Sequence, residues 1–298
     1  MTAKSTIGFI GLGIMGRHMA GHILAAGYPL QVYNRTAAKA APLVEQGAVL
    51  AENPGALAAA CDVVITIVGY PADVEEVYFG DNGIIANARP GTVLVDMTTS
   101  SPELAQRIAA AAAGKGLAAL DAPVSGGDIG ARDGKLAIMV GGAAETFDSV
   151  LPVFETMGAR IALMGPAGAG QHTKMANQIA IASTMLAVSE SLSYAEAAGL
   201  DPAKVIEVVG TGAAASFLLN GLGPKIAARD YAPGFFVHHF VKDMSIALSE
   251  AERMGLDLPG LALARSLYQK LVDGGYGEEG TQALFRVYCG LTATGEAA

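Results

Sequence analysis

The first half of the chain alternates short apolar runs with segments of helical periodicity. The runs are almost wholly hydrophobic, as in "DVVITIV" at 62–68 and "TVLVDM" at 92–97. Strands buried on both faces of a sheet have this composition, and helices between them connect parallel strands. Further strands are expected at 7–10, 30–33, 117–123, 136–142 and 160–164. The pattern predicts an α/β domain built from βαβ units, with its sheet buried on both faces.

The pattern then changes from strands to long helical stretches. Residues 172–198 contain neither proline nor glycine, which is enough for one helix of about 40 Å. Asp201 and Pro202 provide the start signal of a further helix, and helical periodicity continues after it. We therefore expect an α/β domain at 1–165 and an all-helical domain at 166–298, joined by the long helix.

Composition narrows the class of protein. A net charge of -9 argues against nucleic-acid binding, which relies on a basic surface. Mean hydropathy is +0.40, yet no apolar run approaches the roughly 18 residues of a membrane span. Two cysteines, Cys61 and Cys289, are too few for a disulfide framework or a zinc site, so we expect a reducing cytoplasm.

The apolar run that follows Lys4 has an alternative interpretation as an export leader. Arg17 and His18 interrupt the run, and no small-residue cleavage site follows within reach. We therefore expect this segment to belong to the folded protein.

The segment "IGFIGLGIMG" contains the spacing G-x-G-x-x-G, formed by Gly11, Gly13 and Gly16. It follows an expected strand and begins an expected helix, which is the context of a dinucleotide-binding fingerprint. The first glycine permits a tight turn, the second lets a pyrophosphate approach the main chain, and the third lets helix pack on strand. Glycines that serve only a tight turn are the alternative. The expected cofactor contacts are Gly11, Leu12, Gly13, Ile14 and Met15.

The end of the second expected strand bears on the choice of cofactor. An NAD-preferring site usually presents an acidic residue there to the ribose 2′-hydroxyl, whereas this chain has Asn34, Arg35 and Thr36. An uncharged Asn34 does not repel a 2′-phosphate, and the Arg35 guanidinium can pair with it or stack on adenine. NADP(H) is therefore favoured and NAD(H) remains possible. The alternative is a surface arginine beside a helix cap at Thr36.

The stretch "DAPVSGG" is the first candidate for substrate binding. It predicts a strand that runs into a loop of Ser125, Gly126 and Gly127. A hydroxyl and exposed N–H groups at the carboxyl end of a strand suit a carboxylate. A plain turn is the alternative.

The stretch "GAGQHTKMANQ" is the second candidate. Lys174, Asn177 and Gln178 lie three and four residues apart and so share one side of the long helix. Lys174 precedes a strongly apolar stretch, and burial would favour its neutral amine and make it a usable acid or base near neutrality. A solvated surface lysine is the alternative.

The stretch "HHFVKDM" is the third candidate. His238 shares a helix face with Lys242, and His239 shares one with Asp243. No third ligand accompanies the second pair, so no metal is expected. Lys242 either places a positive charge near cofactor or substrate or forms an ion pair with Asp243. Phe236, in the preceding "PGFF", is a candidate for limiting substrate size, together with Phe240 of the same stretch.

Together with "DMTTSSP" at 96–102, these motifs resemble the β-hydroxyacid dehydrogenase family in order and spacing over nearly the whole chain. That family includes 3-hydroxyisobutyrate dehydrogenase, tartronate semialdehyde reductase, glyoxylate/succinic semialdehyde reductases and, more distantly, 6-phosphogluconate dehydrogenase. The resemblance is strongest to bacterial 3-hydroxyisobutyrate dehydrogenase-like proteins.

The resemblance implies a Rossmann amino-terminal domain, a long interdomain helix, an all-α carboxyl-terminal domain and a homodimer or homotetramer. It also implies roles for individual residues: Lys174 as the catalytic acid and base, Ser125, Gly126 and Gly127 on the substrate carboxylate, Asn177 and Gln178 beside the substrate, and Thr99 and Lys242 on the cofactor. Many members carry Asn where this chain has Gln178, so which amide contacts the substrate stays open.

The expected reaction is reversible hydride transfer between NADP(H) and a short β-hydroxy acid or its semialdehyde. Tartronate, glyoxylate and succinic semialdehydes are alternative substrates. An imine reductase and a non-catalytic NADP-binding protein are rival functions, and Lys174 counts against both. No nucleic-acid or membrane partner is expected.

Overall fold

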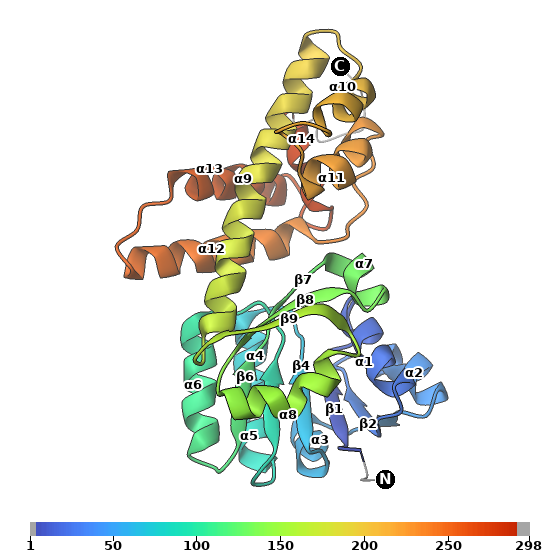
Figure 1. Cartoon of the computed structure of the whole chain (residues 1–298), viewed down its shortest axis with the longest axis vertical. Helices are drawn as coiled ribbons and strands as arrows, with labels where there is room; N and C mark the ends of the chain where they lie inside the picture. The colour runs from blue at the N-terminus through green and yellow to red at the C-terminus, as the bar shows by residue number, and fades with distance from the viewer. Residues whose placement is uncertain (1–3, 291–298) are drawn as a thin grey trace. The chain divides into compact units, whose positions relative to one another are not determined.

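The computed structural model describes residues 4–290 and divides into two compact units, one ending at Lys174 and the other beginning at Met175 (Figure 1). In chain order the strands are β1 (Ile7–Ile10), β2 (Leu30–Tyr33), β3 (Val49–Leu50), β4 (Val63–Thr66), β5 (Val93–Asp96), β6 (Ala118–Asp121), β7 (Val124–Ser125), β8 (Leu136–Gly141) and β9 (Gly158–Gly165). The helices of the first unit are α1 (Gly16–Ala25), η1 (Ala37–Ala40), α2 (Ala41–Glu45), α3 (Pro54–Ala60), α4 (Pro71–Phe79), α5 (Ile84–Asn87), α6 (Pro102–Ala113), α7 (Gly127–Arg132) and α8 (Ala144–Phe154).

One sheet contains all these strands, in the order β3-β2-β1-β4-β5-β6-β8-β7, with β9 paired to β8. From β3 to β6 every pairing is parallel, which confirms the predicted α/β class. The strand order reverses between β1 and β4. In sheets of this kind the crevice outside the carboxyl ends of the two strands at the reversal is where a ligand binds.

Alternate side chains of the central strands enter two separate cores. Ile7 and Phe9 of β1 pack in the core that contains α1 and α8, whereas Ile10 packs in the core that contains α3 and α6. In β4 the same division separates Ile65 from Val64. Both faces of these strands are covered by helices, as Figure 1 shows, so most of their positions are apolar. Each such side chain stabilises the fold by roughly 1.5–3 kcal/mol.

The far edge of the sheet differs from the prediction of one sheet buried on both faces. The short strand β7 was not expected, and it pairs antiparallel with β8. Along β9 the burial alternates: Ile161 and Leu163 pack on the core, whereas Ala162 and Met164 are exposed. One face of β9 is therefore exposed, and the nearly uniform apolar composition of the strand does not reveal this period of two.

Helix starts in the first unit follow local sequence signals. Ser101 begins α6, and its Oγ accepts a hydrogen bond from Leu104 N at 3.1 Å, with Pro102 in the first turn. Gly114 ends the same helix. These caps were predicted, because each depends on residues within one turn of the chain.

The second unit is helical. Its helices are the greater part of α9 (Ala169–Ala197) with α10 (Pro202–Val209), α11 (Phe217–Ala227), α12 (Val237–Arg253), α13 (Pro259–Asp273), η2 (Thr281–Leu284) and α14 (Phe285–Tyr288). Asp201 caps α10 as predicted, since its Oδ1 accepts from Ala203 N at 2.9 Å. Met185, Met244 and Tyr268 belong to the single core of this unit. Between residues 175 and 290 no strand is assigned, so the all-helical prediction is confirmed.

Within residues 4–290 none of the helices has the length and apolar character needed to cross a bilayer.

Candidate active site

The glycine loop between β1 and α1 has the geometry of a dinucleotide cradle. Gly11 has φ +99°, and a Cβ atom there would lie 2.0 Å from Ile67 O. At Gly16 a Cβ atom would lie 1.9 Å from Gly11 O. Both positions therefore require glycine for the fold itself. A Cβ on Gly13 would meet nothing within 4 Å, so the main chain there is open to a ligand, and the loop fits a pyrophosphate.

Asn34 supports this loop from the end of β2. Its Oδ1 accepts a hydrogen bond from Leu12 N at 2.8 Å, and its Nδ2 donates to Thr36 O at 2.9 Å. The next side chain, Arg35, is 86% exposed and lies 3.4 Å from Asp73 Oδ1. Asn34 thus shapes the cofactor loop, while Arg35 has the reach to meet a ligand above it.

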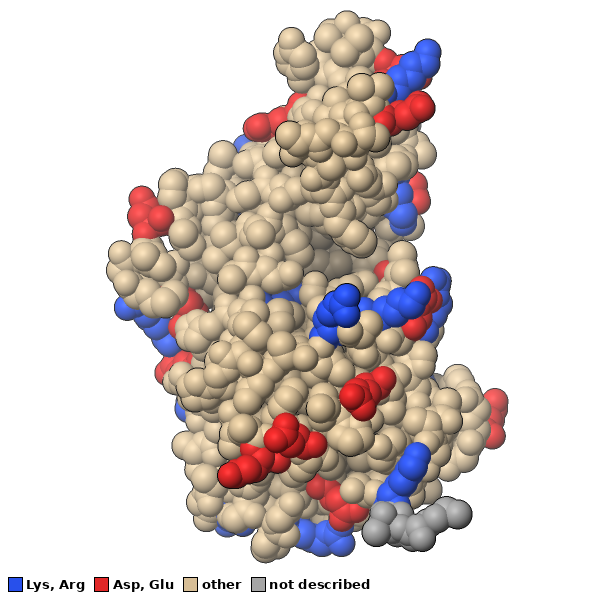
Figure 2. All heavy atoms as spheres, in the orientation of Figure 1, with Lys and Arg blue, Asp and Glu red and all other residues tan. Residues whose placement is uncertain are grey.

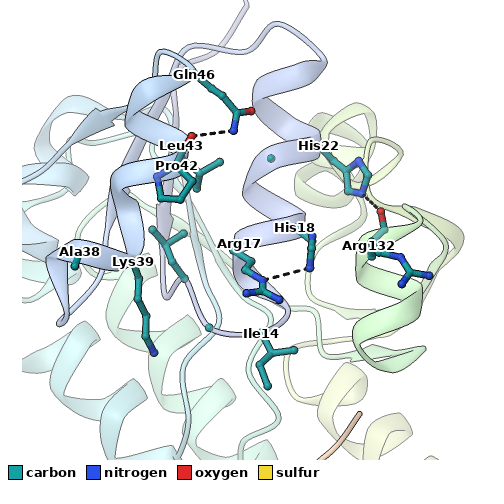
Figure 3. A pocket seen from close by; sticks show the side chains of 13 residues that line it. Ile14, Arg17, His18, His22, Ala38, Lys39, Pro42, Leu43, Gln46 and Arg132 are labelled. Carbon is teal, nitrogen blue, oxygen red and sulfur yellow. Dashed lines mark hydrogen bonds between the residues drawn. The ribbon is translucent and has the colours of Figure 1, made fainter. Parts of the chain in front are cut away.

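A groove of about 600 Å³ opens beside the loop, over α1 and η1 (Figure 3). Among its lining residues are five basic side chains and Gly13, and the lining residues within the described chain include no carboxylate. The basic residues are Arg17, His18, His22, Lys39 and Arg132. We call this the basic groove. Burial and the adjacent Arg17 lower the pKa of His18.

The sequence reasoning did not single out Lys39, which lines the basic groove from η1. A signal existed, because Lys39 follows Asn34 by five residues and a helical turn brings such residues back toward the strand end. The signal is weak, since an isolated lysine after a strand is usually solvated.

The loop after β5 carries Thr99 and is held from two sides. Thr98 N donates to Asp96 Oδ1 at 3.0 Å, and Val68 N donates to Thr98 Oγ1 at 3.0 Å. Thr66 also donates to Asp96 Oδ1, at 2.9 Å. Burial raises the pKa of Asp96 to about 6, although the hydrogen bonds from these threonines oppose the shift. These bonds fix the chain directly before Thr99.

The Ser125 loop differs in its setting from the prediction. Ser125 lies on the antiparallel strand β7, whereas the parallel strand before it, β6, already ends at Asp121. The chain then turns through Gly126 (φ +129°) and Gly127 (φ +62°) into α7. Both glycines adopt conformations that side chains resist, so the residues "SGG" are needed for the turn as well as for any ligand.

Lys174 lies in the second turn of α9 with its side chain 7% exposed. Its Nζ donates a hydrogen bond to Val124 O at 2.8 Å, and Val124 directly precedes Ser125. The alternative of a solvated surface lysine is therefore wrong. Two separate motifs, 50 residues apart, are brought together at this amine.

The remaining polar candidates form a series of contacts in the helical unit, in which Gln178 and Asp243 are buried. Asn177 Nδ2 donates to Gln178 Oε1 at 2.7 Å, and Gln178 Nε2 donates to Asp243 Oδ2 at 2.6 Å. Lys242 Nζ lies 3.1 Å from Asp243 Oδ1. The ion-pair alternative for Lys242 is thus present, and Asp243 fixes the Gln178 amide. The sequence pairs Asp243 with His239 and with Lys242, and the contact with Gln178 was not predicted because nothing local links the two residues.

The two aromatic candidates, Phe236 before α12 and Phe240 within it, differ in burial. Phe240 is wholly buried and packs edge-on against Tyr268, with ring centroids 5.0 Å apart. Its expected role at a substrate pocket is wrong, because it lies on the face of α12 that forms the core. Phe236 is partly buried and stacks on His238. Among residues 4–290 no three His, Cys, Asp or Glu side chains are grouped as a metal site would need.

Known protein families match both halves of the chain. Residues 6–165 match the NAD-binding domain of 6-phosphogluconate dehydrogenase. Residues 168–288 match the NAD-binding region of NADP-dependent 3-hydroxyisobutyrate dehydrogenase. The chain belongs to the β-hydroxyacid dehydrogenase family. Its motifs had predicted this, and it is therefore an NAD(P)-dependent hydroxyacid dehydrogenase.

Relatives of this β-hydroxyacid dehydrogenase extend over nearly its full length. An uncharacterized oxidoreductase of Bacillus subtilis is 55% identical, covering 96% of this chain and 99% of its own. A probable mitochondrial 3-hydroxyisobutyrate dehydrogenase-like protein of Arabidopsis thaliana is 52% identical over 95% of this chain and 84% of its own. The 2-hydroxy-3-oxopropionate reductase of Escherichia coli is 40% identical over 90% and 92%.

The fold is also shared with solved structures. The 3-hydroxyisobutyrate dehydrogenase of Mycobacterium tuberculosis with L-serine has a TM-score of 0.87 and 30% identity, covering 95% of this chain and 98% of its own. The predicted Rossmann domain, long helix and helical domain are confirmed.

Proposed function

We propose that this β-hydroxyacid dehydrogenase interconverts 3-hydroxyisobutyrate or a similar short β-hydroxy acid with its semialdehyde, using Lys174 as general acid and base. The observation that carries the proposal is the buried Lys174 amine, hydrogen-bonded to Val124 O at the start of the Ser125 loop. A buried amine exchanges a proton near neutrality more readily than a solvated one.

A nicotinamide cofactor, when bound at the glycine loop, would supply the hydride in reduction and accept it in oxidation. In reduction Lys174 holds the proton as an ammonium group and gives it to the carbonyl oxygen of the semialdehyde. In oxidation the neutral amine of Lys174 takes the proton of the hydroxyl group. Val124 O accepts one N–H of the amine and so limits the directions in which the Lys174 proton can point.

Hydrogen-bond donors of the Ser125 loop and of α9 are proposed to bind the substrate beside the Lys174 amine. Ser125, Gly126 and Gly127 offer a hydroxyl and two N–H groups to the substrate carboxylate. On α9 the amides of Asn177 and Gln178 follow Lys174 by three and four residues, on the same side of the helix. Asp243 holds the Gln178 amide nitrogen, which fixes the orientation of that group.

NADP(H) is the favoured cofactor, and NAD(H) remains possible. The basic groove supports this preference, since it places cationic side chains beside Gly13, and the end of β2 lacks the carboxylate of an NAD-preferring site. Arg35, Thr36 and Lys39 are proposed to hold the 2′-phosphate. Thr99 and Lys242 are proposed to contact the nicotinamide end.

The two parts of the chain have different proposed tasks: residues 1–165 bind the cofactor, and residues 166–298 bind substrate and associate with another copy. A homodimer or homotetramer is supported by exposed apolar side chains on the helical unit, including Tyr194 and Phe217. Neither cysteine is in a disulfide, which fits a cytoplasmic location. A net charge of -9 disfavours nucleic acid as a partner.

The substrate is tested by assaying purified protein with NADPH and NADH in parallel, against 3-hydroxyisobutyrate, tartronate semialdehyde, glyoxylate and succinic semialdehyde. We expect the highest kcat/KM with the 3-hydroxyisobutyrate pair. A pocket distinguishes a single methylene by only about 1–3 kcal/mol, so slower reactions with the others are expected. A higher kcat/KM with another semialdehyde would show that the proposed substrate is wrong. Reduction of cyclic imines and of none of these substrates would show that the proposed reaction is wrong.

A further inference from the structure

The side chain of Gln171 bridges two segments that are far apart in sequence. Its Oε1 accepts a hydrogen bond from Ser100 N at 3.0 Å, and its Nε2 donates to Thr98 O at 2.7 Å. Gln171 is 0% exposed, as it must be to replace water at both groups. The oxygen and the nitrogen of the Gln171 amide thus both form hydrogen bonds with the main chain of one loop.

The two bridged groups belong to the residues on either side of Thr99. Thr98 is itself held by Asp96 and by Val68 N, so the loop after β5 is fixed to its own sheet. The Gln171 amide adds a link from this loop to α9. In an α-helix, residues three apart lie on one side, so Gln171 and Lys174 occupy successive turns of the same face.

The start of α9 is fixed independently by Asp121. Its Oδ1 accepts from Gly168 N at 2.7 Å, and its Oδ2 accepts from Gln171 N at 2.8 Å. The carboxylate therefore satisfies N–H groups that the first turn of a helix leaves unpaired. Space around it is closed: a Cβ atom on Gly141 would lie 2.4 Å from Asp121 Oδ1. The first turn of α9 cannot shift without losing these bonds.

We propose that Gln171 is a positioning residue, which couples the loop carrying Thr99 to the turn of α9 carrying Lys174. Asp121 limits movement of the first turn of α9 along the helix axis, and Gln171 limits rotation of α9 relative to the loop that carries Thr99. The inference rests on the proposed role of Lys174. Hydride and proton transfer require alignment of donor and acceptor, and a misplacement of about 1 Å can cost about 10²-fold in rate.

Gln171→Leu tests the coupling. Leucine has a similar volume but leaves Ser100 N and Thr98 O without their partner, so the loop and the helix turn can separate. We expect kcat to fall by roughly 10- to 100-fold, because the amine is displaced from its working position. The decisive readout is a double-mutant cycle with Lys174→Ala, measured as single-turnover hydride transfer at saturating cofactor and substrate.

If Gln171 acts through the amine, Gln171→Leu changes the rate of the Lys174→Ala enzyme by less than about 3-fold. A full and additive loss in that background would overturn the proposal, and so would an unchanged kcat of Gln171→Leu alone. If Lys174→Ala alone retains normal turnover, the proposed catalytic role of Lys174 is wrong. That result does not depend on any Gln171 variant.

Two further variants separate positioning from stability. Gln282 is also buried, with its Nε2 donating to Asp230 O and Ala232 O at 3.1 Å in the helical unit. Gln282→Leu removes comparable bonds elsewhere and should lower Tm while kcat stays within about 2-fold. If Gln171→Leu does not fold, Gln171→Asn keeps the amide but shortens it by one methylene. It should then lower kcat in the same, Lys174-dependent way, and an unchanged kcat would contradict the proposal.

Discussion

At the scale of single residues, the proposed preference for NADP(H) rests on charged side chains near the glycine loop. Lys39 lies in the basic groove beside Gly13, whereas Arg35 is nearly free in solvent with a long contact to Asp73. An exposed ion pair of this kind contributes little, so Arg35 can leave it for a ligand. A 2′-phosphate brings the extra negative charge that distinguishes NADP(H), and a lysine in a groove can pair with it as a point charge.

Replacing that lysine should therefore change cofactor selectivity. We predict that Lys39→Ala raises KM for NADPH by about 10-fold while KM for NADH changes by less than about 3-fold, since a charged hydrogen bond contributes about 1.5–3 kcal/mol. Steady-state kinetics with both cofactors measure this. Lys270→Ala, on the exposed side of α13, is the matched control and should alter neither value. Equal losses with NADPH and NADH would mean that Lys39 contacts a part common to both cofactors.

Residues were predictable from sequence where their partners are local. The glycines of the fingerprint, the Ser101 cap and the Asp201 cap all act within one turn of the chain. Gln171 and Asp243 were missed because their partners lie about 70 and 65 residues away, and no periodicity reports such pairs. Asn34 was chosen for its lack of charge, yet its amide also supports the loop at Leu12 N.

At the scale of elements, the turn from β1 into α1 contains one glycine that the fold requires and one that the proposed ligand requires. Gly16 is enclosed by the main chain of Gly11, whereas Gly13 faces open space. The two glycines belong to one motif, but only one of them is needed for packing. The edge strands β7 and β9 could not be predicted in the same detail. Their sequences, "VS" and "RIALM", indicate neither the direction in which each strand pairs nor which side chains are exposed.

Alanine at each glycine should separate the two roles. We predict that Gly16→Ala destabilises the protein by roughly 2 kcal/mol or more, because its methyl group would overlap Gly11 O. Gly13→Ala should leave Tm nearly unchanged and weaken NADPH binding by about 10-fold or more, because the methyl group occupies the space of the pyrophosphate. Thermal unfolding and cofactor titration of both variants measure this. Strong cofactor binding by Gly13→Ala would place the pyrophosphate elsewhere.

At the scale of the whole molecule, the proposed self-association rests on exposed side chains of the helical unit. On the face shown in Figure 2, uncharged side chains cover most of the helical unit, and charged ones are scattered. Tyr194, Val208 and Phe217 are 77%, 71% and 84% exposed. Large exposed apolar side chains that form a continuous patch are typical of an interface, whereas single ones are ordinary.

A charge on that surface should dissociate the assembly. We predict that Phe217→Glu converts a dimer or tetramer into smaller species, measured by sedimentation equilibrium, because a carboxylate would be desolvated at the interface. Leu50→Glu, on the exposed strand β3, is the control and should not change the mass. A monomeric wild-type protein, or an unchanged mass of Phe217→Glu, would contradict this interface.

The proposed proton transfer by Lys174 is tested most directly by the turnover of Lys174→Ala. We predict that kcat falls by about 10²-fold or more in both directions, since the variant has no group to exchange the proton, while the Kd of NADPH stays within about 3-fold of wild type. The measurement is single-turnover hydride transfer together with cofactor titration on the same preparation. Turnover within a few fold of wild type, with the cofactor bound normally, would contradict the account.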